Sequence, residues 1–461
     1  MRLGIDFGTT NTVAAITGAG GEPAVLPLDP GAPETGTLRT LLYVERDGTI
    51  HAGNEAVRLH RAQNVGRMPR FSREWVGVIG VFVGEFVAKG YEIKGHDEYV
   101  DVYADVDADA PGRLLHSLKS PLASDYAGTK LFGRSYTLEE LIAAFLTRAR
   151  EHVEALCGQP VREAVFGRPV HFAGARSAAD DERAQERLRA AAELAGFERV
   201  AFVLEPIAAG LAYGAGCPLD AGSHALVFDF GGGTLDLAVL RIDDSGGYGG
   251  RSVLATGGVD IAGDYFDQSI FRHVIRPWLG EGVRWGPQRL EVPAHLMDAL
   301  SDWQDVGALC NAATLAFLRE AQADCTDPAR LYALEDFVFR GHAYDVYDRV
   351  EHCKTALSSQ RFASIDYHAE AIGIWQPVTR PQFESFVARE CRIIQAEIDR
   401  TLEQAGLEAG QIDRIIRTGG SSAIPLFIDM LAGMFGRDKV IESSLFTSVA
   451  SGLALAARER G

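Results

Sequence analysis

The sequence predicts an α/β protein made of two related lobes, and three observations lead to this fold class. The chain has 461 residues, which is too long for one hydrophobic core. Segments with strand-like and helix-like patterns alternate along it. The segment LGIDFGTTNTVAAI, residues 3–16, also has the same form as VFDFGGGTLDLAVL, residues 227–240, in the other half of the chain. Both have an apolar strand, Asp-Phe-Gly, a small-residue turn with Thr, and a second apolar strand, so each predicts a β-hairpin.

The segments between and after the hairpins predict alternating helices and strands. Helical periodicity runs from Tyr136 to Cys157, where Thr137 and Glu140 form a capping box. A helix is also expected from Pro206 to Tyr213, with Pro in its first turn. The remaining expected elements are a strand over 161–170, a helix over 178–195, a strand over 200–204, a helix over 380–405, a strand over 412–418 and a final Ala-rich helix.

These elements suggest a division into two lobes, each with an insertion. Lobe I would span 1–220, with a core of 1–39 and 136–220 and an insertion subdomain over 40–135. Lobe II would span 221–461, with a core of 221–261 and 376–461 and an insertion subdomain over 262–375. Within the first insertion, the acidic segment DVYADVDADAPG, residues 101–112, is expected to be a loop.

Composition and charge exclude several classes of function. The net charge of −18 argues against nucleic acid or an anionic membrane as the main partner. Six scattered cysteines show no metal-ligand spacing and are expected to be reduced thiols. The most apolar window, residues 76–84, is far shorter than a membrane helix, and no signal peptide is expected before the first strand. These observations favour a soluble, cytoplasmic protein.

The glycine turns suggest the chemistry of a site. Asp229 and Asp236 lie in the two strands that flank three consecutive glycines, and Asp6 holds the corresponding place in the first hairpin. Gly and Thr turns present backbone N–H groups to phosphate, but carboxylates repel phosphate unless a cation lies between them. Two such turns therefore suit a Mg²⁺–nucleotide held in a cleft. A single glycine-rich hairpin could be only a tight turn. A second copy and the pair Gly419-Gly420 favour the site.

These motifs resemble the actin, sugar-kinase and heat-shock ATPase superfamily, and in particular the nucleotide-binding domain of DnaK-type chaperones of the heat shock protein 70 family. The matching segments, in order, are GIDFGTTNT, HSLKSPL, FGRPVHFAG, LEPIAAGLAYG, VFDFGGGTLD, DRVEHCKTALSS and TGGSSAIP. The resemblance implies a two-lobed actin-like ATPase fold of duplicated ribonuclease H-like domains around a central nucleotide cleft. The chain is most similar to short, YegD-like members, which implies that no peptide-binding domain follows the lobes.

The resemblance also implies roles for individual residues. Lys119 would be the catalytic lysine and Glu205 would orient water or Mg²⁺, although a surface lysine and a helix N-terminal charge are the plain alternatives. Asp236 would polarise the catalytic water or merely support the turn. Asp6 and Asp229 would bind Mg²⁺ largely through water, with Asp229 and Thr234 also catalytic. The nucleotide would be held by Gly8, Thr9, Thr10, Asn11, Gly231, Gly232, Gly233, Gly263, Glu351, Lys354, Ser358, Gly419, Gly420 and Ser421.

The sequence departs from the family at three positions. Thr355 and Ala423 stand where the family has two arginines that sandwich adenine, so stacking of about 1–2 kcal/mol each would be lost. Phe446 stands where an aspartate is expected near the last helix, and Pro169 resembles the family's switch proline.

The resemblance implies a slow ATPase that uses ATP, ADP and Mg²⁺ and opens and closes on the nucleotide. Its role would be chaperone-like, with a possible client or co-chaperone protein as partner and no nucleic acid or membrane. Three alternatives stay open: a nucleotide sensor with little hydrolysis, a small-molecule kinase of the sugar-kinase branch, and a filament-forming protein.

Overall fold

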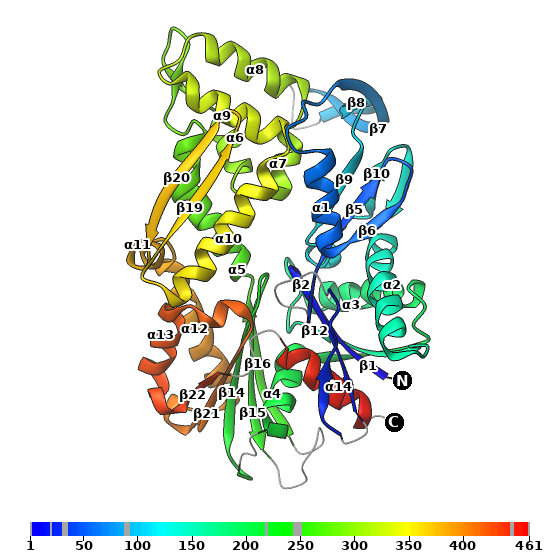
Figure 1. The fold of residues 1–461 in the computed structure, drawn as a ribbon, viewed down its shortest axis with the longest axis vertical. Coiled ribbons are helices and arrows are strands. Elements are labelled where there is room, and N and C mark those ends of the chain that lie inside the picture. The colour runs from blue at the N-terminus through cyan, green and yellow to red at the C-terminus, as the bar shows by residue number, and fades with distance from the viewer. Residues whose placement is uncertain are drawn as a thin grey trace.

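The computed structural model describes residues 2–18, 21–29, 36–86, 93–216, 220–242, 251–442 and 447–459. Figure 1 shows two halves, each with a central sheet in its lower part and an insertion above it. The mixture of sheets and helices confirms the predicted α/β class.

The first sheet has the order β13-β12-β1-β2-β3, with β4 also paired to β2. Its strands are β1 (Arg2–Phe7), β2 (Asn11–Thr17), β3 (Pro23–Val25), β4 (Thr37–Arg39), β12 (Glu163–Arg168) and β13 (Arg199–Leu204). Strands β1, β2 and β3 pair antiparallel, whereas β12 and β13 run parallel to β1.

The second sheet repeats this arrangement in the order β22-β21-β14-β15-β16. Its strands are β14 (His224–Phe230), β15 (Leu235–Ile242), β16 (Arg251–Val259), β21 (Arg414–Thr418) and β22 (Val440–Glu442). Strands β14, β15 and β16 pair antiparallel, and β21 and β22 run parallel to β14. The same sequence of pairings in both sheets confirms that the fold is duplicated and that both glycine segments form hairpins.

Helices outside the two sheets follow the sequence expectations with one exception. Helix α2 (Leu138–Cys157) begins with the predicted capping box at Thr137, and α3 (Ala178–Leu194) follows as expected. The single helix expected over 380–405 is wrong, because two helices form, α11 (Arg380–Phe386) and α12 (Ala388–Ala405). Val387 separates them. Its side chain is buried, and its backbone angles, φ −114° and ψ 12°, are not those of an α-helix.

Two helices lie between the sheets, α4 (Glu205–Gly216) and α14 (Ser448–Glu459). Their small side chains form a shared apolar cluster with residues of both sheets. They cross very closely, because a Cβ at Gly452 would lie 1.7 Å from the carbonyl oxygen of Ala208. Helix α14 approaches β1 in the same way, since a Cβ at Gly4 would lie 2.3 Å from the amide nitrogen of Ala454. The last helix therefore packs on the sheet of the first half.

The first insertion contains a small sheet of order β6-β5-β9 and a long hairpin. The hairpin pairs β7 (Phe71–Phe86) with β8 (Ile93–Asp107), so the loop expected over 101–112 is wrong for its first seven residues. Apolar Ala104 and Val106 alternate there with Asp105 and Asp107, which is the period of a strand. The other elements are β5 (Leu41–Glu45), β6 (Ile50–Ala52), α1 (Gly53–Gln63), β9 (Gly112–His116), η1 (Ser120–Ala123), β10 (Gly128–Leu131) and β11 (Arg134–Thr137).

The second insertion is mainly helical and carries the largest apolar core. Its elements are α5 (Gly263–Ile270), η3 (Phe271–Ile275), η4 (Arg276–Leu279), β17 (Arg284–Trp285), β18 (Leu290–Glu291), α6 (Ala294–Ala299), α7 (Trp303–Leu309), α8 (Ala312–Ala323), α9 (Pro328–Phe339), α10 (Ala343–Ser359), β19 (Phe362–Ala369) and β20 (Ile372–Thr379). The chain then continues through α11, α12, η5 (Ala409–Gln411), η6 (Gly420–Ala423), α13 (Pro425–Phe435) and η7 (Arg437–Lys439). Within the described residues, none of the helices has the length and apolar character needed to cross a bilayer.

Candidate functional site

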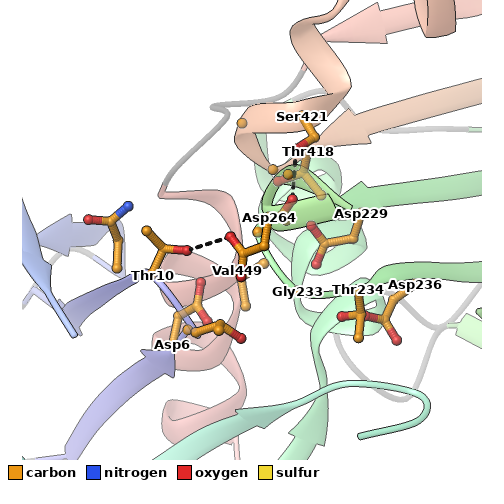
Figure 2. Close-up of a pocket in the computed structure, with 18 of the residues that line it drawn as sticks. Asp6, Thr10, Asp229, Gly233, Thr234, Asp236, Asp264, Thr418, Ser421 and Val449 are labelled. Atoms are coloured by element: carbon orange, nitrogen blue, oxygen red, sulfur yellow. Dashed lines mark hydrogen bonds between the residues drawn. The ribbon is translucent and has the colours of Figure 1, made fainter. Parts of the chain in front are cut away.

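A cavity of about 280 Å³ lies where the two glycine hairpins face each other. Figure 2 shows side chains of both halves around it, with Asp6 and Thr10 on one side and Asp229, Thr234 and Asp236 on the other. Every site residue expected from the sequence lines this cavity: Asp6, Gly8, Thr9, Thr10, Asn11, Lys119, Glu205, Asp229, Gly231, Gly232, Gly233, Thr234, Asp236, Gly263, Glu351, Lys354, Ser358, Gly419, Gly420 and Ser421. The structure therefore brings together residues from seven separate segments of the chain.

The two hairpin turns approach each other so closely that only glycine fits in one of them. A Cβ at Gly232 would lie 2.5 Å from Thr10 Oγ1, and a Cβ at Gly233 would lie 2.8 Å from Thr9 Oγ1. Without side chains, the backbone N–H groups of this turn remain accessible to oxygen atoms of a ligand. The paired turns form a cradle of the kind that phosphate groups occupy.

The third glycine segment is joined to the second hairpin. Gly419 has φ +79°, and a Cβ there would lie 2.3 Å from the carbonyl oxygen of Phe230. Ser421 Oγ donates a hydrogen bond of 2.8 Å to the carbonyl oxygen of Gly231. The turn after β21 therefore continues the wall of the cavity beyond the phosphate cradle.

Three aspartates lie at the base of the cradle, of which Asp229 and Asp236 are buried and Asp6 is partly buried. Asp229 and Asp236 are direct partners across the β14–β15 pair and are 7% and 2% exposed. Burial, followed by the charge of Glu205, raises the pKa of Asp6 and of Asp236 to about 7. Burial and the charges of Glu205, Asp236 and Asp6 raise the pKa of Asp229 well above its usual range. These groups repel one another, so the site favours a bound positive charge.

Lys119 and Glu205 form a buried ion pair in the same cavity. Lys119 Nζ lies 2.6 Å from Glu205 Oε1, and the two side chains are 9% and 10% exposed. Burial lowers the pKa of Lys119, but the attraction of Glu205 and Asp6 outweighs burial, so its pKa is raised and the ammonium stays charged. The structure therefore places Lys119 inside the cavity and excludes the surface position that was its plain alternative.

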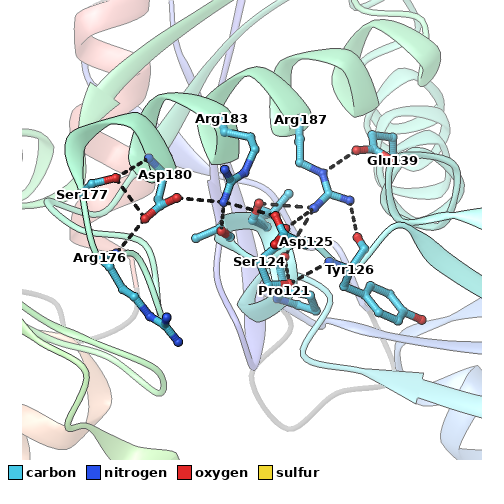
Figure 3. A network of polar contacts seen from close by, with 12 residues as sticks. Pro121, Ser124, Asp125, Tyr126, Glu139, Arg176, Ser177, Asp180, Arg183 and Arg187 are labelled. Atoms are coloured by element: carbon cyan, nitrogen blue, oxygen red, sulfur yellow. Dashed lines mark hydrogen bonds and ion pairs between the residues drawn. The ribbon is translucent and has the colours of Figure 1, made fainter. Parts of the chain in front are cut away.

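The loop after Lys119 is held by two arginines of α3, as Figure 3 shows. Arg187 donates hydrogen bonds to the carbonyl oxygens of Ser124 at 3.1 Å and Tyr126 at 2.7 Å. It also bonds Glu139 Oε1 at 2.5 Å, and Arg183 bonds the carbonyl oxygen of Ala123. Lys119 immediately precedes η1, and these contacts hold the end of η1 and the residues after it.

The charges of the cavity fit a divalent cation. Asp6, Glu205, Asp229 and Asp236 provide four carboxyl groups, and Lys119 is the ammonium paired among them. Among the described residues, no group of three or more His, Cys, Asp or Glu side chains is close enough to ligate a bare metal ion. This donor set suits Mg²⁺, which keeps much of its water and binds few carboxylates directly.

The far wall of the cavity contains the residues expected around the ribose and base. Lys354 Nζ is fixed by Asp267 Oδ2 at 2.5 Å and by the carbonyl oxygen of Gly263 at 3.0 Å. Thr355 and Ala423 line this wall, and none of the described lining residues is an arginine. The two positions at which the sequence lacks the family's arginines, Thr355 and Ala423, therefore both lie at the cavity. Phe446 lies outside the described residues.

Sequence reasoning missed several residues of the wall. Asp264 also lines the cavity, where Thr10 Oγ1 donates to its Oδ1 at 3.5 Å, and burial raises its pKa to about 7. The segment GDYFD at the start of α5 carries Asp264 and Asp267 one turn apart, and this spacing was the available signal. The other missed lining residues are Val13, Thr418, Ile424 and Val449. Next to Pro169, the amide of Val170 donates to Asp236 Oδ1 at 2.5 Å.

The fold and the site together define a class of protein. A duplicated α/β fold, with two glycine hairpins facing each other across a cavity, is the arrangement of the actin-like ATPases. Comparison with known proteins is more specific, because the family model "Hsp70 protein" matches residues 117–280 and 343–458. The chain belongs to the Hsp70 family.

Curated relatives include two proteins named "Chaperone protein DnaK", from Thermotoga neapolitana and Thermotoga petrophila. Each is 27% identical over 351 residues, which is 75% of this chain. The match covers 49% of each relative, so the chain spans about half the length of the relatives that it matches.

Proposed function

We propose that this chain binds ATP and ADP with Mg²⁺ in the cavity between the hairpins and hydrolyses ATP slowly. The observation that supports this most is that both glycine turns, the Lys119–Glu205 pair and the three aspartates Asp6, Asp229 and Asp236 meet around one cavity. The β- and γ-phosphates would bind between the two turns. The adenosine would extend toward Lys354, Ser358 and Gly420.

The residues at the base of the cradle suggest how hydrolysis would proceed. Lys119 would stabilise negative charge on the transferred phosphoryl group, since its ammonium stays charged in the buried pair. Asp236 is held by Val170 and by Thr234 Oγ1, which donates to Asp236 Oδ2 at 2.7 Å. This fixed carboxyl would orient the attacking water. Bound Mg²⁺ would neutralise phosphate charge, with Asp6 and Asp229 holding it largely through water. No strong general base is provided, so turnover would be slow.

Opening and closing of the two halves would accompany the nucleotide cycle, because the ligand would touch both hairpins. The link from Val170 to Asp236 joins the segment after β12 in the first half to β15 in the second. A change at the terminal phosphate would therefore reach the segment around Pro169. The expected role is chaperone-like, with a client or co-chaperone protein as partner.

A nucleotide sensor with little hydrolysis is the second candidate, and the adenosine wall favours it. Thr355 and Ala423 replace two guanidinium groups at this wall, so the base would bind with less stacking. A sensor of this kind would bind nucleotide and change conformation without appreciable turnover.

The test is ATP binding by calorimetry and phosphate release with Mg²⁺ for the wild type, Asp229→Asn and Lys119→Ala. Exposed Lys130→Ala serves as the control for loss of a lysine. Micromolar binding with slow turnover, lost in both site variants and kept in the control, is the expected result. Binding without turnover in the wild type would favour the sensor. Absence of binding to any nucleotide would refute both.

A further inference from the structure

A second cavity of about 370 Å³ adjoins the nucleotide cavity. The two share Thr9, Thr10, Gly233, Asp264 and Glu351, so a ligand in one would contact the walls of the other. The rest of the second wall comes from the insertions of both halves and from the segments beside the hairpins. Its volume lies in the usual range for small-molecule sites.

Carboxyl groups dominate the wall of this second cavity. Six line it: Asp260, Asp264, Asp267, Asp302, Asp348 and Glu351. Among the described lining residues, the guanidinium of Arg39 is the one side chain with a permanent positive charge. It is already engaged, because Arg39 Nη2 lies 3.1 Å from Asp348 Oδ1 and 3.8 Å from Glu351 Oε2. Two cations from behind the wall also pair with its carboxyl groups, Lys354 with Asp267 and Arg61 with Asp348. Six carboxyl groups thus face three cations, so the wall keeps an excess of negative charge, although burial raises the pKa of Asp264 and of Asp267 to about 7.

The larger hydrogen-bond donors at the wall are also committed to protein acceptors. Tyr347 Oη donates to the carbonyl oxygen of Leu300 at 2.6 Å, and Tyr265 Oη donates to Glu390 Oε1 at 2.9 Å. Gln268 Nε2 donates to Asp302 Oδ2 at 3.0 Å. A ligand that is rich in acceptors, such as a phosphate or a carboxylate, would meet repulsion there and few donors.

One buried acceptor at the wall still lacks a donor. Asp267 Oδ2 binds Lys354 at 2.5 Å, whereas Asp267 Oδ1 is buried and has no hydrogen-bond partner among the described residues. A carboxylate oxygen without a partner costs free energy. A cation at this wall would offset part of that cost through its attraction to the carboxyl group of Asp267, without a direct contact to Oδ1.

We propose that the second cavity binds a small organic cation, an alkyl amine or diamine whose ammonium groups pair with the carboxylates of the wall. An ammonium group supplies three donors and a positive charge, which are the two properties that the wall lacks. A neutral polyol would supply donors but would leave the excess negative charge of the wall uncompensated. The rings of Tyr265, Tyr344 and Tyr347 provide apolar surface for the alkyl part of the amine.

Binding of an amine would affect the nucleotide, a consequence that rests on the proposed function. The shared residues would place the ammonium next to the phosphate cradle, where positive charge favours phosphate. The coupling must be reciprocal, so amine and nucleotide would each tighten the binding of the other. We expect an increase in affinity of several-fold, on the order of the 5–150-fold typical of coupled sites.

The test compares putrescine with 1,4-butanediol, which has a similar chain and no charge, by calorimetry on the whole chain without nucleotide. We expect saturable binding of one putrescine per chain and no binding of the diol. Asp302→Asn and Asp260→Asn should each weaken putrescine at least tenfold, since both residues line only the second cavity. Asp298→Asn, whose side chain is 72% exposed on α6, is the matched control and should bind as the wild type does.

Several results would overturn the inference. These are no binding of putrescine, equal binding of the diol, or equal binding by all three variants, which would show attraction to the acidic surface in general. Competition between putrescine and a non-hydrolysable ATP analogue would show that the cavities are one site. If no nucleotide binds at all while putrescine still binds at Asp302, the proposed function fails and this inference stands.

Discussion

Replacing Gly452 with alanine tests the close crossing of α4 and α14. The added Cβ would lie 1.7 Å from the carbonyl oxygen of Ala208, whereas real Cβ atoms essentially never come closer than 3.0 Å to such an atom. The two helices must therefore separate by at least 1.3 Å at this point, the difference between those two distances. The obstacle is backbone, so no side-chain rotation can relieve it.

The expected magnitude follows from two opposing effects. Overpacking of a tight core costs about 1–3 kcal/mol, and more where backbone must move. Alanine in place of glycine inside a helix stabilises the helix by about 1 kcal/mol. We expect Gly452→Ala to lower the free energy of unfolding by about 2 kcal/mol or more, because the separation also disturbs the apolar cluster between the two sheets.

Urea unfolding followed by circular dichroism measures this change, with Gly433→Ala as the matched control. Gly433 is also a helical glycine, in α13, but nothing lies within 4 Å of the added Cβ. The free energy of unfolding of the control variant should therefore rise by about 0.5–1 kcal/mol, because alanine has a higher helix propensity than glycine. If Gly452→Ala is as stable as the wild type, or both variants shift in the same direction, the packing described for these helices is wrong.

Three further predictions concern the site. Because burial raises the pKa of Asp264 from 3.8 to about 7, its contribution to stability is present below pH 3.8 and lost as pH rises toward 7. The free energy of unfolding without ligand should therefore fall between about pH 4 and 7, by up to about 4 kcal/mol for this group, and Asp264→Asn should flatten the slope in urea titrations. Arg187→Lys keeps a charge but loses the fork that holds the loop after Lys119, so kcat for ATP should fall about tenfold with nucleotide affinity unchanged; a parallel loss of affinity would contradict the positioning role. Ala423→Arg should tighten ADP binding about 2–30-fold by restoring a cation beside the base, as measured by calorimetry, and an unchanged affinity would show that the base lies elsewhere.

The local features of the fold could be predicted because their signals lie within short segments. The two hairpins depend on apolar strands around turns of Gly, Thr and Asn, and the start of α2 depends on Thr137 and Glu140, three residues apart. The cavity could be anticipated for a related reason. Each of its glycine and acidic segments follows or precedes a strand of one of the sheets, so the duplicated topology brings the segments to the same place.

The predictions from sequence are wrong or incomplete where tertiary contacts decide the structure. The helix is interrupted at Val387, whose side chain is buried in the apolar core of the second half of the molecule. The helical periodicity of the segment does not reveal this burial. The acidic strand β8 depends on pairing with β7. Asp264 became part of the cavity because α5 begins directly against the second turn, where its amide donates to the carbonyl oxygen of Gly232 at 2.8 Å. Local patterns point to β8 and to Asp264, but the partners that they contact are distant in the sequence.

The crossing of α4 and α14 has a mechanical consequence. Where two helices touch through backbone and glycine, no interlocking side chains resist rotation of one helix over the other. Such a contact can act as a pivot, while ion pairs at a distance from it connect Arg39 of β4 and Arg61 of α1 in the first half to Asp348 of α10 in the second. A small rotation at the crossing would produce the largest displacements at the ends of the insertions, which lie farthest from it. The close packing of α4 and α14 would then also be the point about which the two halves rotate.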